Sequence, residues 1–243
     1  VEKQNTYVAY SNRYICVEIK NPQTTLDFEV VFLNGYNGYS KFLDFIRSSN
    51  ELRLFYSNGK DTKYAYVSFK SITKTELQSN TIQSSLSLDK LSLWLNKVNY
   101  QISVNEDVKG KTFPFGYPHI YSSSYNGEIY VKNNGEVKAP LNIIIAGAVN
   151  NPRVDILDGD TIISSLKIIV KSDDCIINVN SDESDQFITI TENGVTKNAY
   201  QLQDFSCDNF LFIDKGEKKI RFSPGVNAKT TCNIQLLEGY GGN

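Results

Sequence analysis

The chain has 243 residues, of which 40% are hydrophobic and 21% charged, so its composition is that of a globular protein and outside the disordered range. This length corresponds to one large β domain or to two ordinary domains. Residues 1–122 carry 14 Lys and Arg against 11 Asp and Glu, whereas residues 123–243 carry 11 against 16. Neither half has the clustered basic residues of a nucleic-acid-binding surface, and the change of charge is consistent with two modules that have different neighbours.

The composition and the turn signals favour β-strands. Tyr and Phe are abundant, at 15 and 13 residues, and β-branched and aromatic side chains suit a pleated, half-buried surface. Seven Asn-Gly or Asp-Gly dipeptides, which tolerate the positive φ of tight hairpin turns, begin at positions 34, 37, 58, 126, 134, 158 and 193. Two stretches between them have the alternation of half-buried strands: Leu91, Leu93 and Leu95, then Val98, Tyr100, Ile102 and Val104.

One segment in the first half has helical periodicity instead. Apolar residues recur at i, i+3, i+4 and i+7, and the polar back of the helix is formed by Ser40, Lys41, Asp44, Arg47 and Ser48. The pattern predicts one helix of about ten residues within 39–50, packed on a sheet through a buried apolar stripe. The residues of this stripe are Tyr39, Phe42, Leu43 and Ile46.

A domain boundary is predicted near Ser122–Ser124, which gives domains 1–122 and 123–243. The segment before it, KTFPFGYPHIY (111–121), combines two Pro and a Gly with aromatic residues, as an ordered crossing does. Downstream, short strand-like runs follow one another without helical periodicity, so we expect a β-sandwich or jelly roll without a helix longer than about two turns. The runs are 128–132, 141–146, 153–157, 162–170, 175–179, 187–191, 210–213, 219–222 and 232–237.

The sequence predicts no catalytic, cofactor-binding or metal-binding residue, and hence no cofactor. The single histidine, His119, is the only imidazole base for a Ser-His-Asp or Cys-His mechanism, and its neighbours are those of a structural residue. No phosphate-binding glycine loop occurs. Three acidic clusters offer carboxylates for glycoside hydrolysis or Ca²⁺, but they lack EF-hand spacing and are expected to be solvated. They are Asp155/Asp158/Asp160, Asp173/Asp174 and Asp182/Glu183/Asp185.

The cysteines indicate a chain folded in a reducing compartment. Cys16, Cys175, Cys207 and Cys232 are widely spaced and form no C-x-x-C pair, so they are expected to be free thiols in the core. No apolar run reaches the length of a membrane span, and no signal peptide is expected at the start of the chain.

Two stretches together resemble the distal tail protein family of long non-contractile-tailed bacteriophages. Residues 26–76 contain LDFEVVFLNG, YSKFLDFIRSS, ELRLFYS and KYAYVSFKSITKTE, in the order strand, helix, strand, strand. Residues from Tyr125 onward contain NGEIYVKNNGEVKAPLNIIIAGAVNNPRVDIL, FITITENGV and KKIRFSPGVN, which are similar to the galectin-like C-terminal domain of that family. The resemblance implies a mainly β fold: an N-terminal β-sandwich/hairpin domain with one short helix, then a galectin-like β-sandwich.

By this resemblance the protein would be a structural component of the virion, assembled in the host cytoplasm, and not an enzyme. Its first domain would form a hexameric ring of identical chains that joins the tail tube protein to the tail-tip or tail-associated protein. Its second domain would be a docking platform for receptor-binding or baseplate proteins. DNA would only pass through the ring, and no membrane partner is implied. The long insertion with which some relatives grip receptor-binding proteins is not present in the second domain.

A carbohydrate-binding, lectin-like module is the alternative, because galectin-type sandwiches often bind sugars. Galectins use a cluster of His, Asn, Arg and Trp on one sheet face. The second half of this chain has no His or Trp; its arginines are Arg153 and Arg221, and the only tryptophan, Trp94, lies in the first half. A Tyr could take the place of the Trp as a stacking face. A glycan hydrolase of the tail tip is a third possibility, supported only by the acidic loops.

Overall fold

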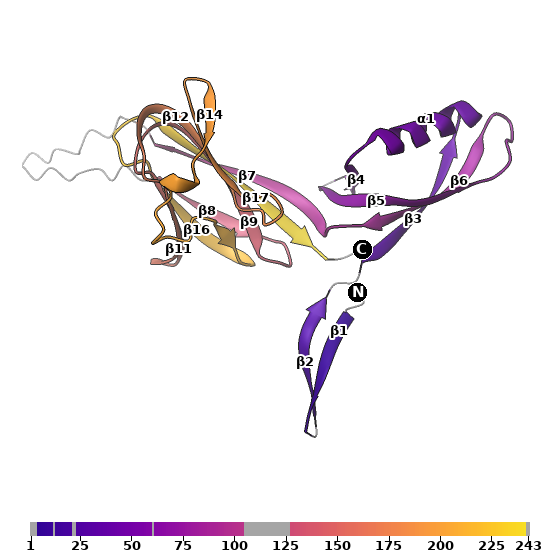
Figure 1. Ribbon diagram of the computed structural model, residues 1–243, viewed down its shortest axis with the longest axis horizontal. Helices are drawn as coiled ribbons and strands as arrows, with labels where there is room; N and C mark the ends of the chain where they lie inside the picture. The colour runs from indigo at the N-terminus through magenta and orange to yellow at the C-terminus, as the bar shows by residue number, and fades with distance from the viewer. Residues whose placement is uncertain (1–3, 12, 21–22, 60, 105–126, 242–243) are drawn as a thin grey trace, which may run out of the picture. The chain divides into compact units, whose positions relative to one another are not determined.

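The computed structural model describes residues 4–11, 13–20, 23–59, 61–104 and 127–241 (Figure 1). The chain is mainly β and divides into two compact units, Val1–Asn96 with Tyr240–Asn243 and Lys97–Gly239. We call them unit 1 and unit 2. The strand β7 (Trp94–Val104) begins in unit 1 and ends in unit 2.

Unit 1 contains a two-stranded hairpin and a larger antiparallel sheet. The hairpin pairs β1 (Gln4–Tyr10) with β2 (Arg13–Lys20). The sheet has the order β4-β5-β6-β3, and β7 joins it beside β5 through one pair, Tyr64 and Leu95. Its strands are β3 (Thr24–Phe32), β4 (Leu52–Ser57), β5 (Thr62–Lys74) and β6 (Ile82–Lys90).

A single α-helix, α1 (Gly35–Ser48), lies on one face of this sheet (Figure 1). It contacts β3 and β6, and the Phe42 side chain packs against a small cluster of three buried residues, Val67, Leu86 and Leu88. Strand β6 explains which face is buried: Leu86 and Leu88 alternate with residues that point to the other side. The cluster is small for a folded unit, so unit 1 keeps much of its apolar surface exposed.

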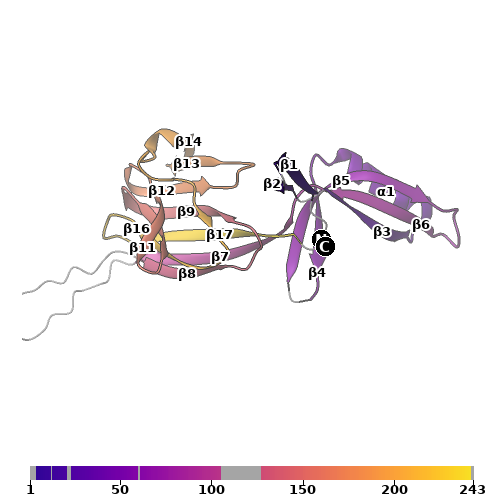
Figure 2. The same cartoon turned by 90° about the horizontal axis from the view of Figure 1, so that it is seen from below.

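Unit 2 is a β-sandwich. One sheet has the order β14-β13-β12-β9-β17-β7, which Figure 2 shows in sequence, and the other has the order β11-β10-β16-β8. A short strand β15 (Phe212–Ile213) pairs with β9, and a 3₁₀ turn η1 spans Tyr200–Leu202. The other strands are β8 (Gly127–Asn133), β9 (Ala139–Asn150), β10 (Arg153–Asp158), β11 (Thr161–Lys167), β12 (Lys171–Asn180), β13 (Phe187–Glu192), β14 (Val195–Asn198), β16 (Gly216–Ser223) and β17 (Thr230–Tyr240).

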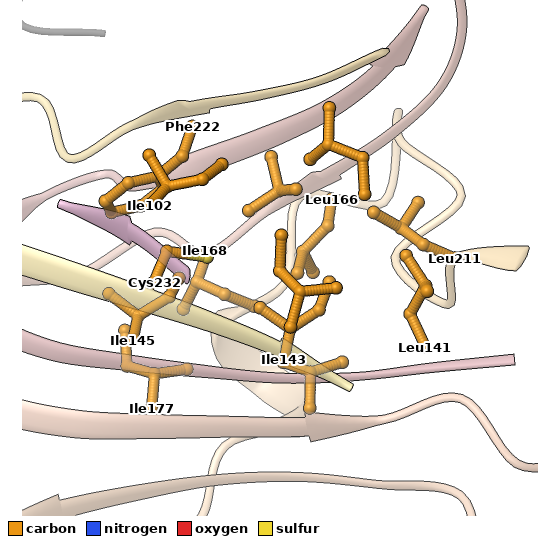
Figure 3. Packing of buried hydrophobic residues seen from close by; sticks show 14 of the residues in the cluster. Ile102, Leu141, Ile143, Ile145, Leu166, Ile168, Ile177, Leu211, Phe222 and Cys232 are labelled. Carbon is orange, nitrogen blue, oxygen red and sulfur yellow. The ribbon is translucent and has the colours of Figure 1, made fainter. Parts of the chain in front are cut away.

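The core of unit 2 lies between its two sheets (Figure 3). Ile143, Ile145 and Ile177 enter it from one sheet, and Phe222 and Leu166 enter it from the other. Each is almost completely buried, because alternate residues of each strand point inward and meet those of the facing sheet. Unit 2 therefore has a continuous core of its own, although some large apolar residues, such as Phe205 at 78% exposure, lie on its surface.

The mainly β fold is confirmed, and so are the predicted strands of the second half. Every run expected after residue 126 lies within or overlaps a strand of unit 2, and the described part of that unit contains no helix longer than η1. The structure adds β14, which follows the turn at Asn193-Gly194. The closer likeness to a galectin stays a prediction.

In the first half, two predictions need correction. The expected strand through Leu91, Leu93 and Leu95 is wrong in its first part, because Leu91–Leu93 connect β6 to β7. The helix begins at Gly35 rather than Tyr39 and ends at Ser48. Gly35 is buried with a φ of +50°, a conformation that favours glycine, so the Asn34-Gly35 pair leads the chain into the helix rather than into a hairpin.

The helix stripe is less buried than predicted. Phe42, Leu43 and Ile46 are half-buried, and Phe45 on the same helix is 58% exposed. The helix lies mainly on β3 and β6, with Lys74 of β5 over its Tyr36 and Tyr39 rings, and Phe45 stays outside this contact.

The domain boundary at residues 122–123 lies outside the described residues, as does His119. Lys97–Val104, assigned from the sequence to the first domain, belong to the compact unit 2. Division into domains 1–122 and 123–243 stays a prediction. No helix in the described part of the chain has the length and apolar character of a membrane span.

We expect Leu43→Ala to lower the free energy of unfolding of unit 1 by about 1–2 kcal/mol, because part of the side chain stays in contact with water in the folded protein. This is less than the roughly 2–5 kcal/mol that a fully buried leucine would cost. Denaturant titration followed by circular dichroism measures the change. The matched control, Phe45→Ala on the exposed side, should change stability by less than about 0.5 kcal/mol; equal losses in both variants would contradict the assignment of faces.

The thiols should differ in reactivity. Cys175 and Cys232 are buried in unit 2, and burial raises the pKa of the Cys232 thiol to about 12 and also raises that of Cys175. The prediction that all four cysteines lie in the core is wrong for two of them, because Cys207 is half-buried and Cys16 is exposed. In a Cys16→Ser variant, we expect a thiol reagent to label Cys207 in the folded protein and the other two only after unfolding. Rapid labelling of all three in the native state would contradict this.

Candidate functional site

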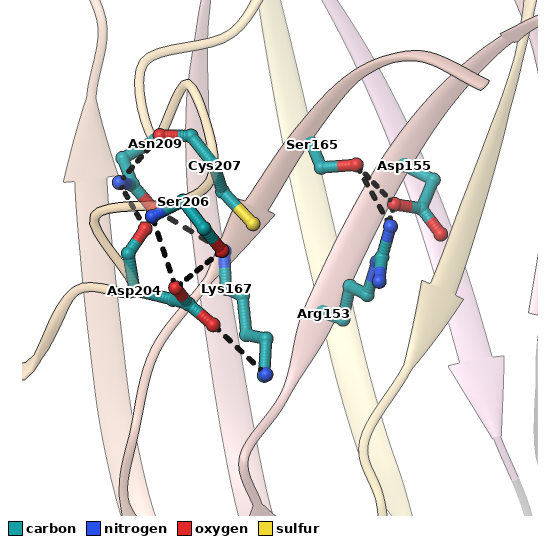
Figure 4. Close-up of polar contacts among 8 residues, drawn as sticks. All are labelled: Arg153, Asp155, Ser165, Lys167, Asp204, Ser206, Cys207 and Asn209. Atoms are coloured by element: carbon teal, nitrogen blue, oxygen red, sulfur yellow. Dashed lines mark hydrogen bonds and ion pairs between the residues drawn. The ribbon is translucent and has the colours of Figure 1, made fainter.

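The carboxylates of the first acidic cluster, Asp155, Asp158 and Asp160, are engaged in hydrogen bonds and ion pairs within the sheet. Asp155 is buried on β10, where its Oδ1 accepts hydrogen bonds from Arg153 Nε and Ser165 Oγ, both at 2.6 Å (Figure 4). Asp158 lies 2.8 Å from Lys218 Nζ, and Asp160 lies 3.6 Å from Lys219 Nζ. Each carboxylate thus has its own cationic partner, which is the arrangement of a salt-bridged sheet surface rather than of an acid and base pair.

The other two acidic clusters differ from each other. Asp173 and Asp174 lie on β12 where its pairing with β9 shifts register. The Asp182 carboxylate accepts hydrogen bonds from the backbone N–H and the hydroxyl of Ser184, as in an Asx-type turn. Within the described ranges, no group of three or more His, Cys, Asp or Glu residues could hold a metal ion.

A turn between η1 and β15 is fastened by a polar network that the sequence reading did not single out (Figure 4). Asp204 accepts a hydrogen bond from Ser206 Oγ at 2.6 Å and forms an ion pair with Lys167 Nζ at 2.9 Å. These contacts hold the pKa of Asp204 well below its usual range, with the Ser206 hydroxyl as the largest cause. Asn209 closes the turn with amide hydrogen bonds to the carbonyl oxygens of Asp204 and Cys207. The Asp-x-Ser pattern was the available signal for this turn.

The outer face of the four-stranded sheet combines ion pairs with one exposed aromatic ring. Arg221 Nε donates to Glu128 Oε1 at 2.6 Å, and this bond lowers the pKa of Glu128. Asp155 pairs across the strands with Arg221, and Tyr130, which is 63% exposed, pairs with Lys219. The structure therefore brings the two arginines of the lectin alternative onto one sheet and adds a tyrosine that the sequence left unassigned.

The motifs that carry the family resemblance occupy positions where the backbone allows few alternatives. Buried Asn133 accepts a hydrogen bond from the Gly135 N–H and donates to the Ile213 carbonyl. Gly147 has a φ of +121°, and a Cβ there would lie 2.7 Å from the Lys229 carbonyl oxygen. Gly225 has a φ of +75° and approaches the Asn150 backbone too closely for any side chain. These residues fix turns and strand crossings and contain no reactive chemistry.

The hairpin of unit 1 is apolar and exposed on both faces. Tyr14 is 76% exposed and Ile15 41% exposed, and they lie on opposite faces because successive residues alternate in this regular part of β2. Val8 and Ile15 form a directly opposed pair whose side chains are also exposed. A two-stranded hairpin is marginally stable alone in water, and exposed apolar patches of this kind are a common feature of interaction surfaces.

The face of the unit 1 sheet opposite α1 has, in part, the contrary character. Three carboxylates on it accept hydrogen bonds from neighbouring hydroxyl groups over 2.6–2.7 Å. Lys70, 3.4 Å from Asp89, is the cation paired with this group. The pairs are Ser85 with Glu29, Ser87 with Asp27, and Thr25 with Asp89. The part of this face formed by β3 and β6 is therefore rich in carboxylates, whereas the part formed by β4 and β5 carries Phe55, which is 64% exposed.

Comparisons with known proteins agree with a tail protein. Residues 1–91 match the family model of the distal tail protein, N-terminal domain. No curated protein sequence matches the chain. The crystal structure of SPP1 Dit, described as a paradigm of the hub adsorption apparatus in phages that infect Gram-positive hosts, matches with a TM-score of 0.65 and 11% identity over 98% of this chain and 87% of that one.

Two structures of the phage P2 baseplate in its activated conformation match as well. The one with Ca matches with a TM-score of 0.58 and 17% identity, and the one with Sr with 0.56 and 18%. Each match covers 96% of this chain and 86% of the other. At such identities these likenesses establish the fold, whereas the family model identifies the N-terminal domain. Residues 1–91 are therefore similar to the N-terminal domain of the bacteriophage distal tail protein, and the rest of the chain is similar to the solved structures in its fold.

Proposed function

We propose that this protein is a structural hub of a long non-contractile phage tail and not an enzyme. Six copies form a ring that joins the tail tube protein to the tail-tip or tail-associated protein. The ring assembles in the host cytoplasm and becomes part of the virion. The observation that carries the proposal is the apolar hairpin of unit 1, which has two exposed faces and no covering within the described residues.

The hairpin supports a ring of identical chains for a geometric reason. A closed ring of more than two copies uses heterologous junctions, in which each subunit contributes two different, complementary patches. The hairpin is one such patch, and the neighbouring copy supplies the surface that covers it. A stable junction needs upwards of about 1,000 Å² of buried surface, and the exposed apolar residues of unit 1 contribute to that area.

The carboxylate-rich part of the unit 1 sheet supports the passage of DNA through the ring. Asp27, Glu29 and Asp89 would repel the phosphate groups of DNA. The groups bonded to these carboxylates are neutral hydroxyls, which add no positive charge that could bind DNA. A surface of this kind toward the channel lets DNA pass without binding it. The mildly basic character of the first half does not contradict this, because its paired lysine on this face, Lys70, is engaged by Asp89.

Unit 2 is the docking platform for receptor-binding or baseplate proteins in this proposal. Its core is complete, so its outer surfaces are free for partners. We retain domains 1–122 and 123–243 as the functional division, with the acidic second domain, galectin-like in architecture, outside the ring. The structural use of Asp155, Asp182 and their neighbours supports a role without catalysis.

We expect the purified full chain to assemble into a ring whose mass by light scattering corresponds to six subunits. Tyr14→Asp combined with Ile15→Asp should disperse it, because each apolar side chain contributes about 1.5–3 kcal/mol when fully buried. The subunit concentration for half-assembly should therefore rise at least about tenfold.

The matched control is Tyr130→Asp, which alters a comparably exposed ring in unit 2 and should leave the mass unchanged. If the hairpin variant assembled like the natural chain, the hairpin would not lie in the subunit junction. If the natural chain stayed monomeric at all concentrations, the proposed ring would be wrong.

Glycan binding is a second candidate function, favoured by the exposed Tyr130 beside the Arg221–Glu128 pair. An aromatic face flanked by fixed polar groups is a feature of sugar sites, but this face shows no defined cleft. We expect simple galactosides to bind no more tightly than about millimolar, and polysaccharide to remain uncleaved. Micromolar binding on a glycan array that Tyr130→Ala abolishes would make the lectin function the better one.

A further inference from the structure

Lys90 is a buried cation without an acidic partner. It ends β6 on the same face as Leu86 and Leu88 and is only 9% exposed. Within the described residues no carboxylate pairs with it, and its Nζ lies 5.7 Å from the centre of the Trp94 ring. Burial lowers the pKa of Lys90 from its ordinary value, because an ammonium removed from water loses hydration. Charges in such positions are normally paired.

A second polar group beside Lys90 also lacks a partner. Thr24 lies directly opposite Lys90 in the β3–β6 ladder, so the two side chains are neighbours on one face. The Thr24 hydroxyl oxygen is buried and has no hydrogen-bond partner. The Thr24 hydroxyl can both donate and accept, but it makes no hydrogen bond to the Lys90 ammonium, and neither group has an anionic partner within the described residues. What is missing from this position is a group with lone pairs and negative charge.

The rim of this position has the composition of a protein interface. Tyr56, 59% exposed, stacks near Trp94 with ring centres 6.0 Å apart, and Leu91 beside Lys90 is also 59% exposed. Lys63 lies opposite Tyr56 and supplies a second cation on the same face. Tyrosine and tryptophan around a desolvated charge are typical of the residues that dominate binding between proteins.

We propose that the Lys90 site, formed by Thr24, Tyr56, Lys63, Lys90 and Trp94, receives a carboxylate side chain from a second copy of this chain. A carboxylate is acceptor-only and offers two oxygens, one for the Thr24 hydroxyl and one for the Lys90 ammonium. The inference rests on the proposed ring and deepens it, because it identifies one of the two patches that a heterologous junction requires.

The chain itself offers suitable carboxylates. Asp44 on α1, Asp61 in the β4–β5 turn and Glu76 after β5 are exposed, and no side-chain contact engages them within the described residues. Within the described residues, unit 1 therefore has at one place two lysines whose partners are aromatic rings, Lys63 over Tyr240 at 3.5 Å and Lys90 near Trp94, and at others carboxylates without a cation. That charge complementarity makes a second copy the occupant, since a ring of identical chains can bring one set against the other.

The competing explanation is a snorkelling lysine whose stem covers apolar surface while its ammonium stays hydrated. In that case removing the charge would leave assembly unchanged and would not weaken the fold. The two explanations therefore differ in a measurable quantity, which is the subunit concentration at which the ring forms.

The experiment compares the full natural chain with Lys90→Met, Thr24→Val and the control Lys41→Met, an exposed lysine on α1. Sedimentation velocity over a concentration series measures assembly, and circular dichroism with thermal denaturation measures folding. We expect Lys90→Met to raise the half-assembly concentration at least about tenfold, because the carboxylate of the neighbour would be buried unpaired. Thr24→Val should raise it in the same direction by less, and Lys41→Met should not change it.

Thr24→Val keeps the inference testable if Lys90→Met does not fold, because it removes only the hydroxyl. Lys90→Arg, which keeps the charge, should assemble better than Lys90→Met. If the natural chain forms the ring and all the variants form it at the same concentrations, the Lys90 site is not at the junction and the ring itself stands. If the natural chain forms no oligomer, the proposed ring is wrong and the second-copy occupant with it.

Discussion

One helix can cover only one face of an antiparallel sheet, so the opposite face of the unit 1 sheet stays uncovered by α1. This constraint limits how much apolar surface unit 1 can bury. Helix α1 shields part of the face on which it lies through Phe42, and the buried cluster behind it, Val67, Leu86 and Leu88, is small. Hydrophobic burial is the main favourable term in folding, so a unit with so little of it depends on additional contacts. The exposed apolar hairpin offers them, and in a ring of identical chains the neighbour completes what the single chain leaves open.

Unit 2 is under no such constraint. Its two sheets face each other, and residues such as Ile143 and Phe222 fill the space between them. Polar groups that enter the interior find partners: Glu238, 1% exposed, accepts hydrogen bonds from the backbone N–H and the side-chain amide of Asn134. A domain with a complete core can vary its outer surface without losing its fold, which is consistent with the docking role proposed for unit 2.

The sequence predicted the elements whose signals are local. Turn dipeptides and short apolar runs identified the strands of unit 2, because hairpin turns and half-buried strands depend on neighbouring residues. Strand β6 was not predicted, because its inward positions include the polar residues Ser84 and Lys90 and its alternation is only weakly apolar. The helix start was misplaced because Asn34-Gly35 has the composition of a hairpin turn, and only its buried position shows that it leads into α1. The motif glycines were recognised as turns, but their close approaches to Lys229 and Asn150 required the tertiary structure.

The Lys90 site could not be predicted from the sequence for a related reason. A lysine at the end of a strand normally indicates a solvated position, and nothing local distinguishes Lys90 from Lys70. The β3–β6 register places Thr24 opposite Lys90, and the β5–β6 register places Val67 on its other side. Lys70 finds Asp89 within its own chain, whereas Lys90 finds only an aromatic ring. Two lysines of one sheet thus differ in whether a carboxylate of the same chain pairs with them. Both lie in unit 1, whose buried apolar cluster is small. Both deficits have the same remedy, a second protein surface that brings apolar cover and negative charge together.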